Sequence, residues 1–209
     1  MTTEKRPSSY DRMRDAMERE FRRYPQAAME RAFGLARDGA YLYVDFAGRR
    51  HRIGRETGRV EFREAGWRHA DYNASMTLFD VLSRAEAAPR CSGQFVSLSA
   101  VGGQVLGAGP GGDLFAPQAR AFAGRCGALR DACARLGGRP MPVGDVSYQL
   151  PLLPFLPVVL QFWDADEEFP AQLKLMWDAN ILDFMHYETT FFAAAHLFQR
   201  LAALGGVAL

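Results

Sequence analysis

Residues 151–178, PLLPFLPVVLQFWDADEEFPAQLKLMWD, decide which kind of fold this chain can adopt. Residues 158–163 are mostly β-branched or aromatic and are apolar on both side-chain faces, which is typical of a strand covered on both sides. The prolines before them cannot donate to a ladder, so we expect strand pairing to begin after Pro157, with an extended edge before it. Downstream of Pro170 the pattern predicts a helix. The stretch therefore predicts a buried central strand that leads into a helix.

Four acidic residues, Asp164, Asp166, Glu167 and Glu168, follow this strand, and we call them the acidic corner. One interpretation is helix capping, because an aspartate accepts from unpaired amides and first-turn glutamates favour the positive end of the helix dipole. The other is a divalent-cation or proton-transfer site, because clustered carboxylates are the hard oxygen ligands that such cations prefer. A single cap uses one carboxylate and four are present, so both interpretations stay open.

Further candidate residues lie close to the acidic corner in the sequence. If the last helix starts beside the end of the strand, His186 and Glu188 converge with the acids, and we expect Glu188 to share a cavity with at least two of them. Trp163, Trp177 and Asp178 are then candidates for the pocket lining. Glu188 also has a capping explanation, because it opens that helix.

The run LPFLPVVLQFWDADEEFPAQLKLMWD, with a glutamate soon after, resembles a bacterial and archaeal family, domain of unknown function 3786. Its members carry a proline-apolar strand followed by a D-x-E-E-F-P-A-like motif, and the resemblance extends over residues 24–201. Some relatives carry an iron–sulfur cluster domain and come from anaerobes with corrinoid or carbon monoxide chemistry, which implies a corrinoid-type partner. This chain lacks the four-cysteine motif, and the family implies no settled activity.

The remaining pattern predicts an α+β fold in a single domain, with a mainly antiparallel sheet packed against helices. We expect residues 1–38 to form an N-terminal helical segment and residues 39–209 to form the α+β domain, with both in one globular unit. Residues 41–62 alternate with a period of two around glycine turns, which predicts a three-stranded meander. Residues 94–101 are predicted as another strand. The other predicted helices start at Asp71 or Asn73, at Pro117 and at Glu188. The helix that starts at Pro117 is predicted to run to Gly137.

Two histidines and a glycine-rich loop receive structural interpretations. His51 lies on the meander and is expected at the surface, and His196 is expected to be a hydrogen-bonded histidine inside the last helix. The glycine-rich run from Gly102 to Gly112 lacks Gly-Lys-Ser/Thr and the βαβ context of a nucleotide loop, so a mobile loop or lid is the better interpretation.

Composition narrows the class of protein. The chain has 209 residues, enough for one sizeable core, and no apolar run of about 18 residues that could span a membrane. Three cysteines, Cys91, Cys126 and Cys133, together with a polar N-terminus, predict a cytoplasmic protein. Basic residues do not form a concentrated patch with interleaved aromatics, so nucleic-acid binding is not expected.

The sequence contains no nucleophile elbow, His-Glu-x-x-His or Cys-x-x-Cys motif that would identify one reaction. Three functional hypotheses therefore stay open. The first is a binding or accessory protein that uses the acidic corner to hold a small-molecule cofactor, a metal or a protein partner. The second is an enzyme whose carboxylates hold a divalent metal. In the third, the acids are purely structural. The sequence leaves the oligomeric state open.

Overall fold

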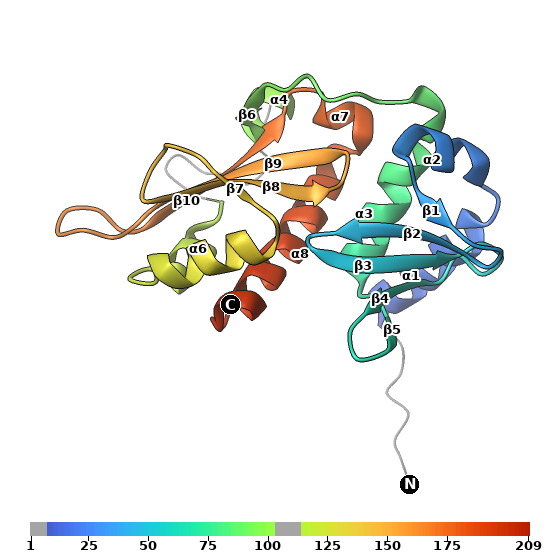
Figure 1. The fold of residues 1–209 in the computed structure, drawn as a ribbon, viewed down its shortest axis with the longest axis horizontal. Helices are drawn as coiled ribbons and strands as arrows, with labels where there is room; N and C mark the ends of the chain where they lie inside the picture. Colours follow the sequence, from blue (N-terminus) through green and yellow to red (C-terminus); the bar gives the residue numbers. More distant parts are fainter. Residues whose placement is uncertain (1–7, 103–113) are drawn as a thin grey trace, which may run out of the picture.

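The computed structural model describes residues 8–102 and 114–209, which form two five-stranded antiparallel sheets with helices packed against them (Figure 1). The helices are α1 (Ser9–Phe21), α2 (Gln26–Phe33), α3 (Tyr72–Ser83), the 3₁₀ helix η1 (Ala85–Ala87), α4 (Leu98–Gly102), α5 (Ala116–Phe122), α6 (Cys126–Arg135), α7 (Ile181–Phe184) and α8 (Tyr187–Gly205). The strands are β1 (Ala36–Arg37), β2 (Tyr41–Phe46), β3 (Arg49–Gly54), β4 (Val60–Arg63), β5 (Trp67–His69), β6 (Phe95–Ser97), β7 (Arg139–Pro140), β8 (Val146–Leu153), β9 (Leu156–Trp163) and β10 (Gln172–Asp178). The α+β class is confirmed, with two sheets in place of one.

The first sheet has the order β1-β2-β3-β4-β5 and contains the predicted meander as its three central strands. Leu42, Val44 and Phe46 are buried and alternate with half-buried residues, as the period of two requires. His51 stands opposite Val44 in the register, so its side chain faces the core and is fully buried. The expectation that His51 lies at the surface is therefore wrong.

The second sheet has the order β6-β10-β9-β8-β7, and β9 is its central, largely buried strand, as predicted. The helix expected after Pro170 is wrong, because that segment is strand β10, which pairs with β9 along its length. Leu173, Leu175 and Trp177 are buried and alternate with more exposed neighbours. This period of two suits a strand that covers one face of the core.

The prolines lie inside the paired region, contrary to the expectation that pairing begins after Pro157. Pro151 and Pro157 stand opposite each other in the β8–β9 register, and an irregularity follows between Pro151 and Leu153. In an antiparallel pair, directly opposed residues alternate between positions that exchange N–H···O=C bonds and positions that do not. Two opposed prolines, which have no N–H, fit only the second type of position. The hairpin can therefore hold both prolines without losing a backbone hydrogen bond between its strands.

Several predicted boundaries also change. The helix expected from Pro117 to Gly137 is two helices, α5 and α6, because Gly124 between them has a left-handed φ of 69°. The strand expected over residues 94–101 is the short β6 followed by α4. Asp71 caps α3 as predicted, by accepting from the Ala74 amide. Residues 103–112 of the predicted lid lie outside the described residues.

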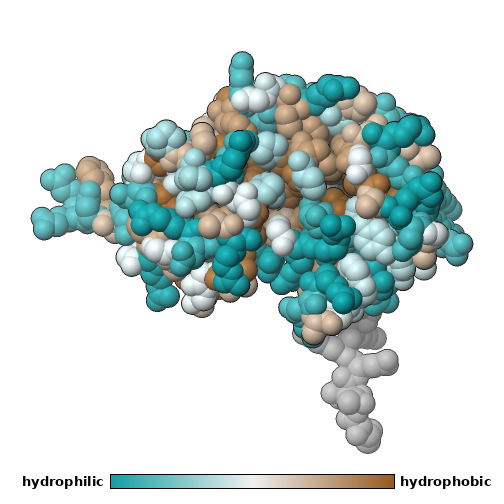
Figure 2. Space-filling model, viewed as in Figure 1, coloured by the Kyte–Doolittle hydropathy of each residue, from teal (hydrophilic) through white to brown (hydrophobic). Residues whose placement is uncertain are grey.

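Helix α8 occupies the centre of the molecule and packs against α3 and α6 (Figure 1). The two sheets also meet directly, where the Ala47 amide donates to the Leu152 carbonyl at 2.8 Å. Phe21 and Met29 from the N-terminal helices belong to the same hydrophobic core as the residues of both sheets. Figure 2 shows hydrophilic side chains around the rim of one face and hydrophobic ones toward its middle. Among the helices of the described residues, none is long and apolar enough to cross a membrane.

A pair of glycine substitutions tests how closely α1 is pressed against the first sheet. Gly58, between β3 and β4, has a φ of 71°, and an added Cβ would collide with the Glu18 carbonyl of α1. Gly34 has a similar φ of 62° and no heavy atom within 4 Å of such a Cβ. We expect Gly34→Ala to cost about 1–2 kcal/mol from backbone strain alone, and Gly58→Ala to cost clearly more. Urea unfolding of both variants measures the difference, and equal costs would contradict the close approach.

Candidate functional site

The acidic corner forms the loop between β9 and β10, not the start of a helix. Asp166 Oδ1 accepts hydrogen bonds from the amides of Glu168 at 2.9 Å and Phe169 at 2.7 Å, and these bonds close the loop. The Phe169 amide is the main cause of the lowered pKa of Asp166. Figure 1 shows this orange loop projecting from one end of the second sheet. Asp166, Glu167 and Glu168 are exposed there.

Asp164 ties this loop to the junction between α5 and α6. Its carboxylate accepts from the Gly124 amide at 2.8 Å and from the Cys126 thiol at 3.3 Å. The Gly124 amide is the main cause of the lowered pKa of Asp164. Beside it, Lys174 lies over the ring of Trp163 at 5.2 Å from the centroid. Asp164 therefore has a structural role inside the fold.

The other predicted site residues lie elsewhere. His186 precedes α8, and its Nδ1 lies 2.8 Å from Asp80 Oδ1 of α3. Glu188 is exposed in the first turn of α8. Strand β10 separates the acidic corner from this region by seven residues, or about 20 Å at the usual rise of a strand. The expectation that Glu188 shares a cavity with the acids is therefore wrong, and within the described ranges no three His, Cys, Asp or Glu residues could together hold a metal ion.

Trp177 and Asp178 are buried, so they belong to the core and do not line an open pocket. The Asp178 carboxylate accepts from the amides of Ser92, Gly93 and Asn180, each at 2.9 Å, and from the Ser92 hydroxyl at 3.0 Å. Burial raises the pKa of Asp178, but these hydrogen bonds outweigh burial, and the pKa lies below its ordinary value. Asp178 thus anchors the loop before β6 to the end of β10.

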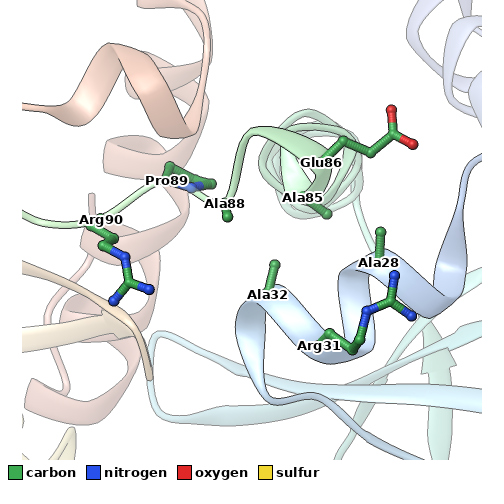
Figure 3. Close-up of a pocket in the computed structure, with 8 residues that line it drawn as sticks. All are labelled: Ala28, Arg31, Ala32, Ala85, Glu86, Ala88, Pro89 and Arg90. Atoms are coloured by element: carbon green, nitrogen blue, oxygen red, sulfur yellow. The ribbon is translucent and has the colours of Figure 1, made fainter.

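One cavity, of about 580 Å³, is a groove between α2 and the segment that begins with η1. Four alanines and a proline line it together with three charged residues, and Figure 3 shows Arg31 and Arg90 on opposite sides of it while Glu86 points away. All three charged residues are exposed. No lining residue has a buried polar atom that lacks a partner, so the groove holds no group that requires a ligand.

A second cavity, of about 320 Å³, lies where α1, β3, the start of α3 and α8 meet. We call it the arginine–histidine pocket. Its charged and polar walls include Arg14, Arg49, Asp71, His196 and Arg200. The volume lies at the lower end of the range for small-molecule sites. Unlike the groove, this pocket combines partly buried cations with an unpaired buried imidazole.

Two arginines give this pocket its positive character. Arg49 lies over the Phe62 ring at 4.5 Å and is 3.8 Å from Glu64, beyond hydrogen-bonding distance. Arg200 donates its Nε to the Ala47 carbonyl in a long bond of 3.4 Å. Burial and then the charge of Arg49 lower the pKa of Arg200. Arg14, by contrast, pairs with two aspartates of its own helix.

His196, which lines the pocket, belongs to a buried pair of histidines. His196 stacks on Phe46 with ring centroids 4.4 Å apart, and His51 meets His196 edge to face at 5.8 Å. Burial lowers the pKa of each ring to about 3, with His196 adding to the effect on His51, and Arg200 and Arg49 adding to the effect on His196. Both nitrogens of His196, and Nε2 of His51, have no hydrogen-bond partner among the described residues. His196 is buried, but the hydrogen bond predicted for it is absent from the described residues.

This arrangement can bind an anion. Guanidinium groups pair with carboxylate and phosphate oxygens in a bidentate geometry, and they do so most strongly when partly removed from water. Arg49 and Arg200 repel each other, and Glu64, whose negative charge acts on both arginines, offsets part of that repulsion. A bound anion would offset more of it.

Sequence reasoning missed Arg49 and Arg200 as site residues, although two local signals were present. In β3, His51 and Ile53 lie two residues apart and share the inward face, which places Arg49 at the rim of the same face. In α8, His196 and Arg200 are four residues apart and lie on one side of the helix. The pairing of these two elements in space was not accessible to pattern reasoning.

Residues 25–200 of the chain match the family described as Domain of unknown function (DUF3786). The chain belongs to this family. No curated protein matches the chain, and neither does any solved structure. The segment that matches DUF3786 includes Arg49, Asp71, His196 and Arg200, whereas Arg14 precedes it. The main polar walls of the arginine–histidine pocket thus lie within the family's domain.

The buried histidines predict how stability depends on pH. Between the ordinary pKa of 6.5 and the folded pKa of about 3, the unfolded chain binds protons on His51 and His196 that the folded chain does not. Stability should therefore fall as the pH drops through this window, by up to about 1.4 kcal/mol per pH unit for each ring. His196→Phe should flatten this decline between pH 6.5 and 5. Denaturant unfolding measures the slopes, and an unchanged slope would contradict burial of the neutral ring.

Replacement of Asp178 tests its anchoring role. We expect Asp178→Asn to cost about 2–4 kcal/mol at neutral pH, because an amide nitrogen replaces one acceptor and leaves buried donors unpaired. Asp166→Asn is the matched control in an exposed loop, and it should cost less. The pKa of Asp178 is lowered below 3.8, so the wild type should lose this advantage as the pH falls below that value and protonates the carboxylate. A gap between wild type and Asp178→Asn that does not narrow as the pH falls below 3.8 would contradict this role.

Proposed function

We propose that this protein is a cytoplasmic binding protein that holds a small anion between Arg49 and Arg200 in the arginine–histidine pocket. The observation that carries the proposal is the placement of two partly buried guanidinium groups beside His196, whose buried nitrogens lack partners. The three free cysteines support a reducing compartment. The function class is the binding protein expected from the sequence, with its site moved away from the acidic corner.

Several features of the pocket support a small ligand. Its cavity of about 320 Å³ accommodates a compact acid or phosphate ester. Phe62 supplies an apolar wall and also carries the Arg49 cation over its ring, which limits the conformations that this side chain can adopt. Gln199 and Ala203, on α8, are exposed and lie at the mouth of the cavity. A ligand can thus enter beside α8 and meet both arginines.

The alternative of a metal-dependent enzyme receives no support from the geometry. That hypothesis placed the metal on the clustered carboxylates, and His186 and Glu188 were expected to join them if the last helix started beside the end of the strand. The β9–β10 loop carries the acids, and strand β10 lies between them and α8. In this proposal, the acids only close the loop and lie at the surface.

Binding of inorganic phosphate and of succinate tests the proposal and separates phosphate from carboxylate recognition. At constant ionic strength, at least one of them should raise the melting temperature of the wild type in a concentration-dependent way. Arg200→Gln and Arg49→Gln should each weaken binding by about tenfold or more, because a charge-assisted hydrogen bond is lost.

Arg50→Gln is the matched control, because Arg50 is the next residue of β3 and pairs with Asp45 at the surface. It should leave the affinity unchanged. Equal weakening by Arg50→Gln and Arg200→Gln would reduce the effect to general surface charge and would contradict a site in the pocket. The same conclusion follows if neither anion stabilises the wild type.

A further inference from the structure

We propose that the anion held in the arginine–histidine pocket also carries an ammonium group, and that this ammonium binds the carboxylate of Asp71. The inference rests on the proposed function and names the ligand class for the same pocket, a small molecule that bears a carboxylate or phosphate together with an amine. Two opposite charges that line one cavity without ion partners of their own point to this class.

Asp71 brings a negative charge to the wall of the pocket. Its Oδ1 accepts from the Ala74 amide at 2.8 Å and caps α3, whereas its Oδ2 accepts no hydrogen bond from any described residue. Oδ2 lies 4.0 Å from Nδ1 of His196, and burial lowers the pKa of that ring to about 3, so the ring is neutral at pH 7. The Asp71 side chain is 54 % exposed and lines the pocket, so a ligand there can reach its carboxylate.

Arg200 brings a positive charge to the same cavity. Its Nε donates to the Ala47 carbonyl at 3.4 Å, and within the described part of the chain its guanidinium forms no ion pair. Arg200 and Asp71 thus line one cavity of about 320 Å³ without pairing with each other. The fold holds two opposite charges apart around a space that a small molecule can occupy.

The other charged and titratable side chains of the pocket already have neighbours of opposite charge or hydrogen-bond partners. Arg14 pairs with two aspartates of its own helix. Nε2 of His69 lies 2.6 Å from Glu18 Oε1, and Arg49 lies 3.8 Å from Glu64. Asp71 is the one acidic residue among the described residues that line the pocket. A cationic group of a ligand therefore has a single carboxylate to bind in this wall.

The two charges select a ligand that carries both signs. Asp71 repels a plain anion that approaches Arg200, and the arginines repel a plain cation that approaches Asp71, because like charges brought close together cost free energy. A ligand with an anionic group and an ammonium group gains an attraction at each end. An amino acid and an amine-bearing phosphate ester both meet this requirement.

Aspartate and succinate form a matched pair of probes, because they differ by a single ammonium group. Calorimetry at pH 7.5 and constant ionic strength should show that the wild type binds aspartate about threefold more tightly than succinate, the amount expected for one exposed ion pair. General attraction by the arginines favours succinate, which carries one more net negative charge. A preference for aspartate therefore cannot come from net charge alone.

Asp71→Asn removes the charge and keeps the helix cap, because asparagine caps a helix about as well as aspartate. In this variant aspartate should bind more weakly and succinate more tightly, each by about twofold to fivefold, so that the preference reverses. A purely structural role of Asp71 would change both affinities in the same direction. If Asp71→Asn does not fold, Asp71→Ser offers a second capping side chain without charge.

Asp45→Asn is the matched control, because Asp45 pairs with Arg50 at the surface and does not line this pocket. It should leave both affinities unchanged. Phosphoethanolamine and ethyl phosphate repeat the comparison for a phosphate, and the amine-bearing member should again bind more tightly. The tighter of the two amine-bearing probes identifies the anionic group that the arginines prefer.

The outcomes separate this inference from the proposed function. Binding of the anions without a preference for the amine-bearing member, or a preference that persists in Asp71→Asn, would overturn the ammonium contact and leave anion binding intact. Equal effects of Asp45→Asn and Asp71→Asn would also overturn it, because the preference would then reflect general surface charge. Binding of none of the four probes would overturn both proposals.

Discussion

Helix α8 must bury opposite flanks at the same time, and the rest of the fold depends on this requirement. His196 and its neighbours pack toward Phe46 of the first sheet, while α6, which packs on β8 of the second sheet, covers another flank. Fully buried side chains such as Leu201 and Phe198 each contribute about 1.5–3 kcal/mol through loss of apolar contact with water. The arginine–histidine pocket exists only where α8 is docked, because its other walls come from the N-terminal half of the chain.

The parts of the fold that could be predicted are those fixed by local periodicity. The apolar run of β9, the alternation of β2 and the long stripe of α8 each contain enough residues to define their own period. Strand β10 was missed because the preceding acids resemble a helix start, and this signal competed with the alternation of Leu173, Leu175 and Trp177. Pairing with β9 decides the structure of this segment, because a capping pattern also occurs in ordinary polar turns.

The candidate site was harder to predict, because its properties arise from contacts between distant segments. Arg49 and Arg200 are far apart in the sequence, and each alone resembles a solvated arginine. His51 stands between two arginines in sequence, so a surface position was the natural expectation, although the alternation with Ile53 points inward. His196 meets Phe46 of β2, His51 of β3 and Asp71 before α3, so whether it finds a hydrogen-bond partner is not encoded by any pattern within α8.

Every sheet edge in the described residues is formed by a very short strand. β1 and β7 have two residues each, and β5 and β6 have three. An edge of this length offers few unpaired backbone groups to a neighbouring molecule, and Arg37 in β1 and Pro140 in β7 disfavour an added strand still further. Strand β7 covers only Tyr148 and Gln149 of β8, and farther along that strand the Leu152 carbonyl accepts from the Ala47 amide of the first sheet. The docking of the first sheet thus occupies a backbone group of β8 that a strand from a second molecule would otherwise meet.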